Sequence, residues 1–191
     1  MIEVQKALDD HISVIRKLEA LVPKITEIAG HMADSIKGGG KILWMGNGGS
    51  AADSQHMAAE LVGRFSRERK AIASIALTTD TSILTALAND YGYEKIFERQ
   101  IEALCDPRDI VVGISTSGNS ENVIAAIRLA KQIGATTVGF TGGDGGRLAE
   151  EVDLCLLSPS HEIPRIQETH SLMGHIICDW IESELAENGR S

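Results

Sequence analysis

Hydrophobic residues recur at helical spacing along the first forty positions of the chain. They are Leu8, Ile12, Ile15, Leu18, Leu21, Ile25, Ile28 and Met32. Their i, i+3 and i+4 recurrence predicts amphipathic helix, and Pro23 is expected to break the run into two helices. The stripe is long for a small chain, which favours packing of helix on helix or burial against another subunit. The alternative is a stripe that packs only on its own sheet.

Short apolar runs follow, each bounded by glycine or polar residues. They lie at 41–46, 72–77, 109–115, 136–141 and 153–158. Helical patterns lie between and after them, at about 50–64, 81–104, 120–133, 145–151 and 165–187. Strands that alternate with helices predict an α/β fold, with a five-stranded parallel sheet covered on both faces. A ligand of such a sheet is expected at the carboxyl ends of the strands.

Length and charge narrow the class of protein. The 191 residues fit one domain with a sizeable core, and the formal net charge is −9. This charge argues against a nucleic-acid partner, which needs a basic surface, but not against one phosphorylated small molecule. The three cysteines have no CxxC spacing, so a reducing cytoplasm is expected. The acidic, amphipathic N-terminal stretch predicts neither a signal peptide nor a membrane span.

Two loops after predicted strands have the composition of a phosphate cradle. In the loop at 46–50, glycines would let the backbone approach an anion closely. The loop at 115–120 places four hydroxyls and a glycine before a helix, and such donors suit phosphate oxygens. The alternative for this loop is an ordinary capped turn. A third loop at 141–146 is expected to be a turn with a secondary role.

A dinucleotide site is a weaker interpretation of the first loop. Gly46, Gly48 and Ala51 fit the pattern G-x-G-x-x-A. That fingerprint needs an acidic residue about twenty positions on, whereas Asp80 comes roughly thirty residues after Ala51. No Gly-Lys-Ser/Thr follows, which excludes a Walker loop.

Three motifs together resemble the phosphoheptose isomerases of the sugar isomerase (SIS) family. They are GNGGSAADSQH (46–56), STSGNS (115–120) and RIQETH (165–170) followed by His175, and the similarity extends to NDYG (89–92) and nearly the whole chain. The resemblance implies a single three-layer SIS domain over residues 1–191. Residues 1–38 would form an N-terminal helical segment in an intersubunit bundle, and 39–191 an α/β sandwich with a C-terminal helix.

The resemblance also implies a reaction. Members convert D-sedoheptulose 7-phosphate to D-glycero-D-manno-heptose 7-phosphate, for the heptose of bacterial lipopolysaccharide or related glycoconjugates. They are cytoplasmic homotetramers with sites formed between subunits, and one zinc per subunit is expected. By motif match, Glu60 and His175 are the catalytic residues. The implied metal ligands are His56, Glu60, Gln167 and His175. The implied substrate contacts are Asn47, Gly48, Gly49, Glu60, Asn89, Asp90, Ser115, Thr116, Ser117, Ser120 and Gln167.

These assignments agree with the chemistry of an aldose–ketose isomerase. Moving a proton between C1 and C2 needs a base and an acid for the oxygens, roles that suit Glu60 and His175. The roles compete with zinc binding, because a carboxylate on zinc is a poorer base and a metal-bound imidazole nitrogen cannot carry a proton. Taken singly, His56 is more typical of a surface residue and His175 of a core histidine.

Spacing adds a structural expectation. His56 and Glu60 are one helical turn apart and can reach one ion. Gln167 and His175 are eight residues apart, about 12 Å along a straight helix. Either Gln167 precedes the helix, or the helix is distorted, or the two residues serve different sites across a subunit interface. Pro164 favours a helix start nearby.

The sequence leaves three alternative functions. Some proteins similar to phosphoheptose isomerases are non-catalytic and bind a replication initiator protein, but they have usually lost the glutamate and histidine that stand here as Glu60 and His175. An SIS-type sugar-phosphate sensor usually carries a DNA-binding domain, and none fits this chain. Isomerisation of a different ketose phosphate is the third alternative.

Overall fold

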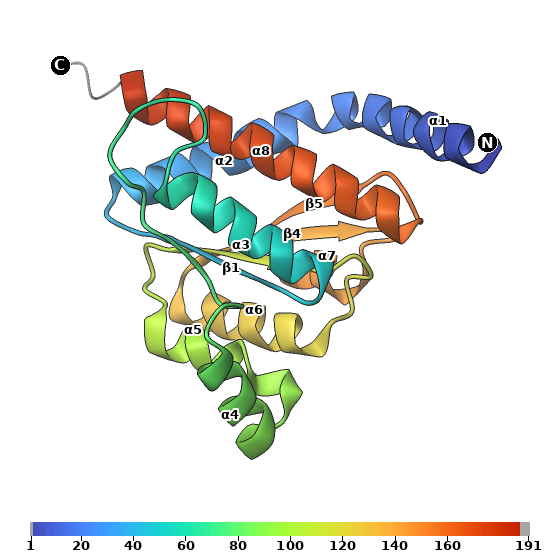
Figure 1. Ribbon diagram of the computed structural model, residues 1–191. Helices are drawn as coiled ribbons and strands as arrows, with labels where there is room; N and C mark the ends of the chain where they lie inside the picture. Colours follow the sequence, from blue (N-terminus) through green and yellow to red (C-terminus); the bar gives the residue numbers. More distant parts are fainter. Residues whose placement is uncertain (1, 188–191) are drawn as a thin grey trace.

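The computed structural model describes residues 2–187 and has three layers, a central sheet with helices on both faces (Figure 1). The strands are β1 (Ile42–Gly46), β2 (Ser74–Ala76), β3 (Ile110–Ile114), β4 (Thr136–Gly142) and β5 (Leu154–Ser158). Every neighbouring pair is parallel, in the order β2-β1-β3-β4-β5. The predicted five-stranded parallel sheet is confirmed, and each predicted apolar run overlaps its strand.

Helices cover the two faces of the sheet. One face carries α2 (Val22–Lys37), α3 (Gly49–Val62) and α8 (Ile163–Glu187). The other carries α5 (Glu98–Leu104), α6 (Glu121–Ile133) and α7 (Gly146–Glu151), and α4 (Thr81–Tyr91) lies beyond them (Figure 1). Because α3 and α8 pack side by side on the same face, residues far apart in sequence can meet between them.

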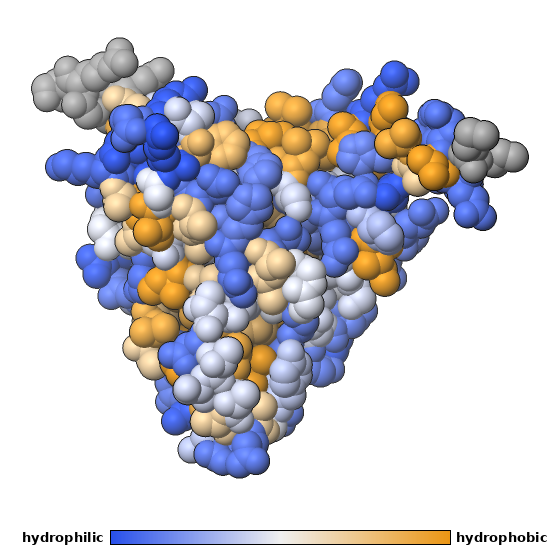
Figure 2. Space-filling model, in the orientation of Figure 1, coloured by the Kyte–Doolittle hydropathy of each residue, from blue (hydrophilic) through white to orange (hydrophobic). Residues whose placement is uncertain are grey.

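The N-terminal stripe forms two helices, as predicted. The helix α1 (Ile2–Lys17) leads through a 3₁₀ turn, η1 (Leu18–Leu21), into α2, where Pro23 stands in the first turn. Proline is tolerated there because the first helical N–H groups have no intrahelical partner. Hydrophobic side chains on α1 stay exposed: Val4 is 67% accessible, Leu8 55% and Ile12 48%. Figure 2 shows this apolar surface at the upper right, over α1.

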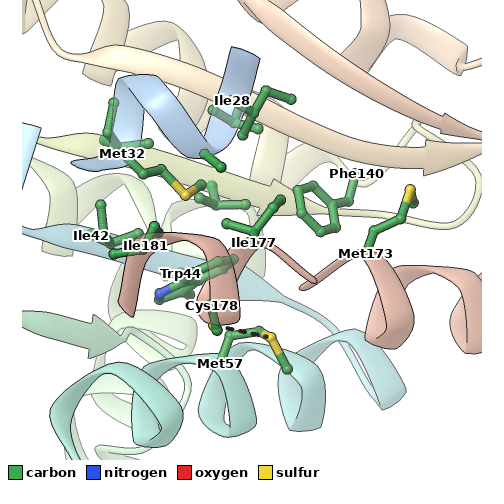
Figure 3. Packing of buried hydrophobic residues seen from close by; sticks show 14 of the residues in the cluster. Ile28, Met32, Ile42, Trp44, Met57, Phe140, Met173, Ile177, Cys178 and Ile181 are labelled. Carbon is green, nitrogen blue, oxygen red and sulfur yellow. Dashed lines mark hydrogen bonds between the residues drawn. The ribbon is translucent and has the colours of Figure 1, made fainter. Parts of the chain in front are cut away.

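Alternate residues of β1 serve two separate parts of the core. Trp44 points toward Met57 of α3 and Cys178 of α8, and all three are buried (Figure 3). Leu43 and Met45 point to the opposite face, among side chains of α5 and α6. Full burial of an aliphatic side chain contributes about 1.5–3 kcal/mol, so this two-sided packing fixes β1 firmly beneath α3 and α8.

The helical pattern predicted over 81–104 is divided among three elements. The chain forms α4, then a 3₁₀ turn η2 (Tyr93–Lys95), then α5. The break is at Gly92, whose φ of +92° is strained for residues with a side chain. Helical periodicity continues across the break, but the backbone turns there and brings Tyr93 back toward the sheet.

Candidate active site

The two candidate phosphate loops meet where the strand order reverses. β1 and β3 are neighbours, with Gly46 in register with Ile114, so the loops that follow them share one edge of the sheet. Asn47 and Asn122, the second residue of α6, exchange two amide hydrogen bonds of 2.9 Å. The hydroxyl of Tyr93 donates to Oδ1 of Asn47, also at 2.9 Å. These bonds fix Asn47, which is one of the predicted substrate contacts.

The hydroxyl of Ser120 in the second loop does not cap the helix that follows it. Ser120 is the N-cap of α6, yet its hydroxyl makes no capping hydrogen bond and lies 2.9 Å from Oγ of Ser115. Ser115 is buried, Thr116 half-buried and Ser117 exposed, so the exposure of the hydroxyls increases along the loop from the core to the solvent. Hydroxyls that do not serve the helix remain available to a ligand.

The third loop packs directly against the second. Gly118 has a φ of +64°, and a Cβ there would lie 1.9 Å from the carbonyl oxygen of Gly145. The backbone N–H of Leu148 donates to the carbonyl of Gly118 at 2.8 Å. A hollow of about 270 Å³ opens beside this contact, and its walls come from both loops and the start of α8. Its lining residues are Thr116, Ser117, Gly142, Gly143, Asp144, His161, Ile163 and Ile166.

Gln167 lies over the start of α3. Gly48 is the N-cap of α3, with a φ of +56° and open space where a Cβ would stand. At Gly49, a Cβ would lie 2.2 Å from Nε2 of Gln167. The amide of Gln167 therefore rests against the first helical residue, and only glycine admits it there. The free N–H groups of a helix N-terminus attract anions.

His56, Glu60 and His175 form a compact cluster between α3 and α8. Nε2 of His56 lies 3.0 Å from Oε1 of Glu60 and 3.4 Å from Nε2 of His175. One ligand atom from each of the three residues lies within 4.8 Å of the others. His56 is exposed, whereas Glu60 and His175 are half-buried. The structure thus unites both predicted catalytic residues and three of the four predicted metal ligands.

This donor set fits zinc. Two imidazole nitrogens and a carboxylate oxygen are ordinary zinc ligands at about 2.0–2.2 Å, and tetrahedral ligands at that distance lie roughly 3.3 Å apart. The two short separations in the cluster, 3.0 and 3.4 Å, are close to that spacing.

Gln167 does not join the cluster in this chain. The helix α8 runs unbroken from Ile163 to Glu187, with Pro164 in its first turn. The start near Pro164 is confirmed, but the explanations in which Gln167 precedes the helix, or the helix is distorted, are wrong. Gln167 faces the start of α3, and His175 lies about 12 Å further along α8.

Asn89 and Asp90 are exposed residues in the last turn of α4, apart from the cluster. Nδ2 of Asn89 donates to Oδ1 of Asp90 at 2.8 Å. The chain then turns at Gly92 and reaches Tyr93, which is bound to Asn47. The segment is therefore tethered to the first phosphate loop through Tyr93. Sequence reasoning missed Tyr93 and Asn122, although NDYG directly precedes the tyrosine.

His170 contacts the backbone at the start of the third loop. It is buried, and its Nε2 lies 3.0 Å from the carbonyl oxygen of Thr141, to which it must donate. Nδ1 has no hydrogen-bond partner within residues 2–187. Burial lowers the pKa of His170 by more than the hydrogen bond to Thr141 raises it. A neutral His170 thus holds the backbone at the start of the third loop.

Comparison with known proteins agrees with this architecture. The SIS domain family matches residues 8–142. The phosphoheptose isomerase of Aquifex aeolicus (strain VF5) is 55% identical over 170 residues, which cover 89% of each chain. That of Helicobacter hepaticus is 50% identical over 188 residues, covering 98% of this chain and 96% of the relative. The structure of phosphoheptose isomerase GmhA from Neisseria gonorrhoeae superposes with a TM-score of 0.90 and 42% identity, covering 95% of this chain and 97% of that one.

Proposed function

Because the chain belongs to the phosphoheptose isomerases of the SIS domain family, we propose a mechanism in which its own Glu60 and His175 move the protons. The reaction is the aldose–ketose isomerisation of D-sedoheptulose 7-phosphate to D-glycero-D-manno-heptose 7-phosphate. The observation that carries the mechanism is the meeting of one carboxylate and two imidazoles between α3 and α8.

Each group has a definite task in the proton transfer. The carboxylate of Glu60 removes a hydrogen from C1 of the ketose, and the C–H electrons form the C1–C2 double bond as the C2 oxygen takes a proton from His175. The resulting enediol returns its O1 proton to His175 while Glu60 delivers its proton to C2. The net change moves one hydrogen from C1 to C2 and one from O1 to O2, which restores both side chains.

The two glycine- and hydroxyl-rich loops are proposed to hold the sugar phosphate. Backbone N–H groups and hydroxyls can bind a phosphate without a basic surface, which suits a chain with net charge −9. The open backbone at Gly48 and the Ser115–Ser120 pair support this assignment. The proposed contacts are Asn47, Gly48, Gly49, Glu60, Asn89, Asp90, Ser115, Thr116, Ser117, Ser120 and Gln167.

We further propose one zinc ion per subunit, held by His56, Glu60 and His175. When bound, zinc would polarise the substrate carbonyl or hold the three side chains together. Gln167 of the same chain faces the start of α3, so it is proposed to serve a different site across a subunit interface. Zinc binding and proton transfer are alternative states of Glu60 and His175, separated by substrate binding.

Self-association as a homotetramer is proposed from the exposed apolar face of α1, which a second copy would cover. No helix within residues 2–187 is long and apolar enough to cross a membrane. We propose that residues 1–191 act as one SIS domain in the cytoplasm and that the product feeds bacterial lipopolysaccharide or related glycoconjugates.

The direct test is an NMR assay of sedoheptulose 7-phosphate turnover by the unaltered protein, Glu60→Gln and His175→Gln. Turnover by the parent and its loss by at least a hundredfold in both variants are expected, in line with the weight of general acid–base catalysis. A parent without turnover would overturn the function, and a fully active variant would overturn that residue's role. A parallel assay after chelation tests the zinc proposal, because loss of turnover in an intact assembly would contradict chemistry by the side chains alone.

The non-catalytic alternative, a protein that binds a replication initiator, receives no support from the relatives, which are named as isomerases. Glu60 and His175 are both present and lie in one cluster.

A further inference from the structure

One buried carboxylate organises the irregular segment that follows α3. Glu182 of α8 has an accessibility of 0%, and its Oε1 accepts a hydrogen bond from the backbone N–H of Phe65 at 2.9 Å. Its Oε2 accepts from the N–H groups of Ser66 and Arg67, both at 2.7 Å. The hydroxyl of Ser66 adds a contact of 3.1 Å. Four donors from three consecutive residues therefore surround a single side chain.

Arg69 completes this arrangement from within the same segment. Its side chain is only 5% accessible, and its Nε lies 3.1 Å from Oε1 of Glu182 as an ion pair without hydrogen-bond geometry. Its Nη2 donates to the carbonyl of Glu60 at 2.8 Å, and its Nη1 to the carbonyls of Leu61 and Gly63 at 2.9 and 3.2 Å. The last carbonyls of a helix lack intrahelical partners, so Arg69 caps α3 and complements its dipole.

Glu182 keeps its charge despite its position. Burial raises its pKa, but the backbone hydrogen bonds from Ser66, Phe65 and Arg67 outweigh that effect, so the pKa lies below its ordinary value. A buried charge that loses its partner is strongly destabilising, whereas the complete arrangement is well satisfied. Glu182 and Arg69 therefore lock α8, the irregular segment and the end of α3 into one relative position.

The Glu182–Arg69 ion pair is also in contact with residues of the His56–Glu60–His175 cluster and their neighbours. The carbonyl held by Arg69 belongs to Glu60 itself. The amide held by Glu182 belongs to Phe65, whose ring centroid lies 5.6 Å from that of His175. Glu182 stands seven residues after His175, which is two turns along the same side of α8. Glu60 therefore contacts the Arg69–Glu182 ion pair through its backbone carbonyl, and His175 is linked to that ion pair through Phe65.

We propose that Glu182 and Arg69 are positioning residues, which set the separation between Glu60 and His175. The proposal rests on the proposed function, because that separation matters only if the two side chains act together. Neither residue is part of the His56–Glu60–His175 cluster. A misplacement of about 1 Å can cost roughly a hundredfold in rate, so a small loosening of this ion pair should reduce turnover without unfolding the chain.

Glu182→Gln is the first test, because it keeps the shape of the side chain but replaces an acceptor oxygen with a donor. Glu184→Gln is the matched control on the same helix, because it makes the same change at a half-buried carboxylate whose Oε1 lies 2.7 Å from Nζ of Lys37. For Glu182→Gln we expect kcat to fall at least tenfold and KM for sedoheptulose 7-phosphate to stay within twofold. Glu184→Gln should match the parent. A folded Glu182→Gln protein with kcat within twofold of the parent would overturn the proposal.

Arg69→Lys is an independent test of the positioning role if the Glu182→Gln protein does not fold. Lysine keeps the positive charge beside Glu182 but cannot reach several carbonyls at once. We expect kcat to fall at least fivefold with KM again within twofold. A folded Arg69→Lys protein with parental kcat contradicts the positioning role, whatever the other variant does.

Zinc affinity separates this proposal from the proposed function. Competition with a chromophoric chelator measures zinc binding to the metal-free variants, without any substrate. A looser cluster should bind zinc at least tenfold more weakly in Glu182→Gln, whereas Glu184→Gln should be unchanged. If the parent turned over no sugar phosphate, the isomerase assignment would fail, but this measurement would still decide whether Glu182 positions the cluster. Parental zinc affinity in a folded Glu182→Gln protein would overturn the proposal.

Discussion

Nε2 of His175 on α8 lies 3.4 Å from Nε2 of His56 on α3. Two unprotonated nitrogens at that distance repel, so either one ring donates a proton to the other or a cation lies between them. With Glu60 beside His56, the same three atoms can pass protons or hold a metal, and the contents of the site decide which.

Zinc binding should depend on His56. Loss of an outer partner of a metal site typically costs 10–100-fold in affinity, so loss of a ligand in His56→Ala should weaken zinc binding by at least about a hundredfold. Titration of the metal-free protein in competition with a chelator measures this. His31→Ala, which changes an exposed histidine on α2, is the control and should bind zinc like the parent. Unchanged affinity in His56→Ala would remove the cluster as a zinc site.

Gly49→Ala should separate activity from stability. The new Cβ would meet Nε2 of Gln167 at 2.2 Å, and that amide is the movable end of a flexible side chain. The fold should therefore persist, while Gln167 is displaced and kcat/KM falls at least tenfold. In the control Gly30→Ala, the Cβ lies 4.0 Å from the Trp180 ring, so stability should rise by up to about 1 kcal/mol with normal activity. Thermal unfolding and turnover are to be measured on both variants, and a Gly49→Ala protein as active as the parent would contradict the role of Gln167.

His170 should make stability depend on pH. Burial lowers the pKa of His170 below its ordinary value of 6.5, so as pH falls the unfolded chain takes up this proton before the folded one. The contribution of neutral His170 to the free energy of unfolding is therefore complete above about pH 6.5. It is lost as pH falls toward the pKa of the folded state, by at most about 1.4 kcal/mol per pH unit. Asp53 opposes the shift. Urea unfolding at pH 7.5, 6.5 and 5.5 at fixed protein concentration should show a flatter dependence for His170→Gln, and an identical slope would contradict this account.

The exposed face of α1 should control assembly. Leu8 is 55% accessible between Val4 and Ile12, and a glutamate there would place an unpaired charge in any interface formed by that face. Leu8→Glu should therefore shift sedimentation toward smaller species, with unchanged helix content by circular dichroism. Ser13→Glu adds the same charge at an exposed position on another side of α1 and should sediment like the parent. A full-size Leu8→Glu assembly would show that α1 is not an interface.

The sequence was sufficient for the architecture because periodicity reflects burial. The apolar runs marked every strand, and the hydroxyl-rich loops marked the sheet edge where β1, β3 and β4 end. The helical pattern over 81–104 did not predict the break inside it, because the turn depends on the φ of a single residue, Gly92, and hydrophobic spacing continues across it. A backbone dihedral leaves little trace in a pattern of apolar and polar positions.

The supporting residues of the site could not be predicted in the same way. The Asn47–Asn122 pair exists because β1 and β3 are neighbours, and strand order is a tertiary property. Arg69 and Glu182 are charged residues 113 positions apart, and only the packing of α8 against the end of α3 brings them together. The motif residues His56, Glu60 and His175 could be predicted because histidine and glutamate are residue types that bind metals and transfer protons.

The length of α8 has a consequence for mixed assemblies. Gln167 and His175 lie about 12 Å apart on one continuous helix, and in this chain only His175 reaches the His56–Glu60–His175 cluster. If each residue completes a different site, two kinds of defective subunit can rescue one another. Inactive Gln167→Ala and His175→Gln proteins, unfolded together and reassembled, would then regain a fraction of the activity set by the statistics of subunit mixing, as in complementation between two alleles.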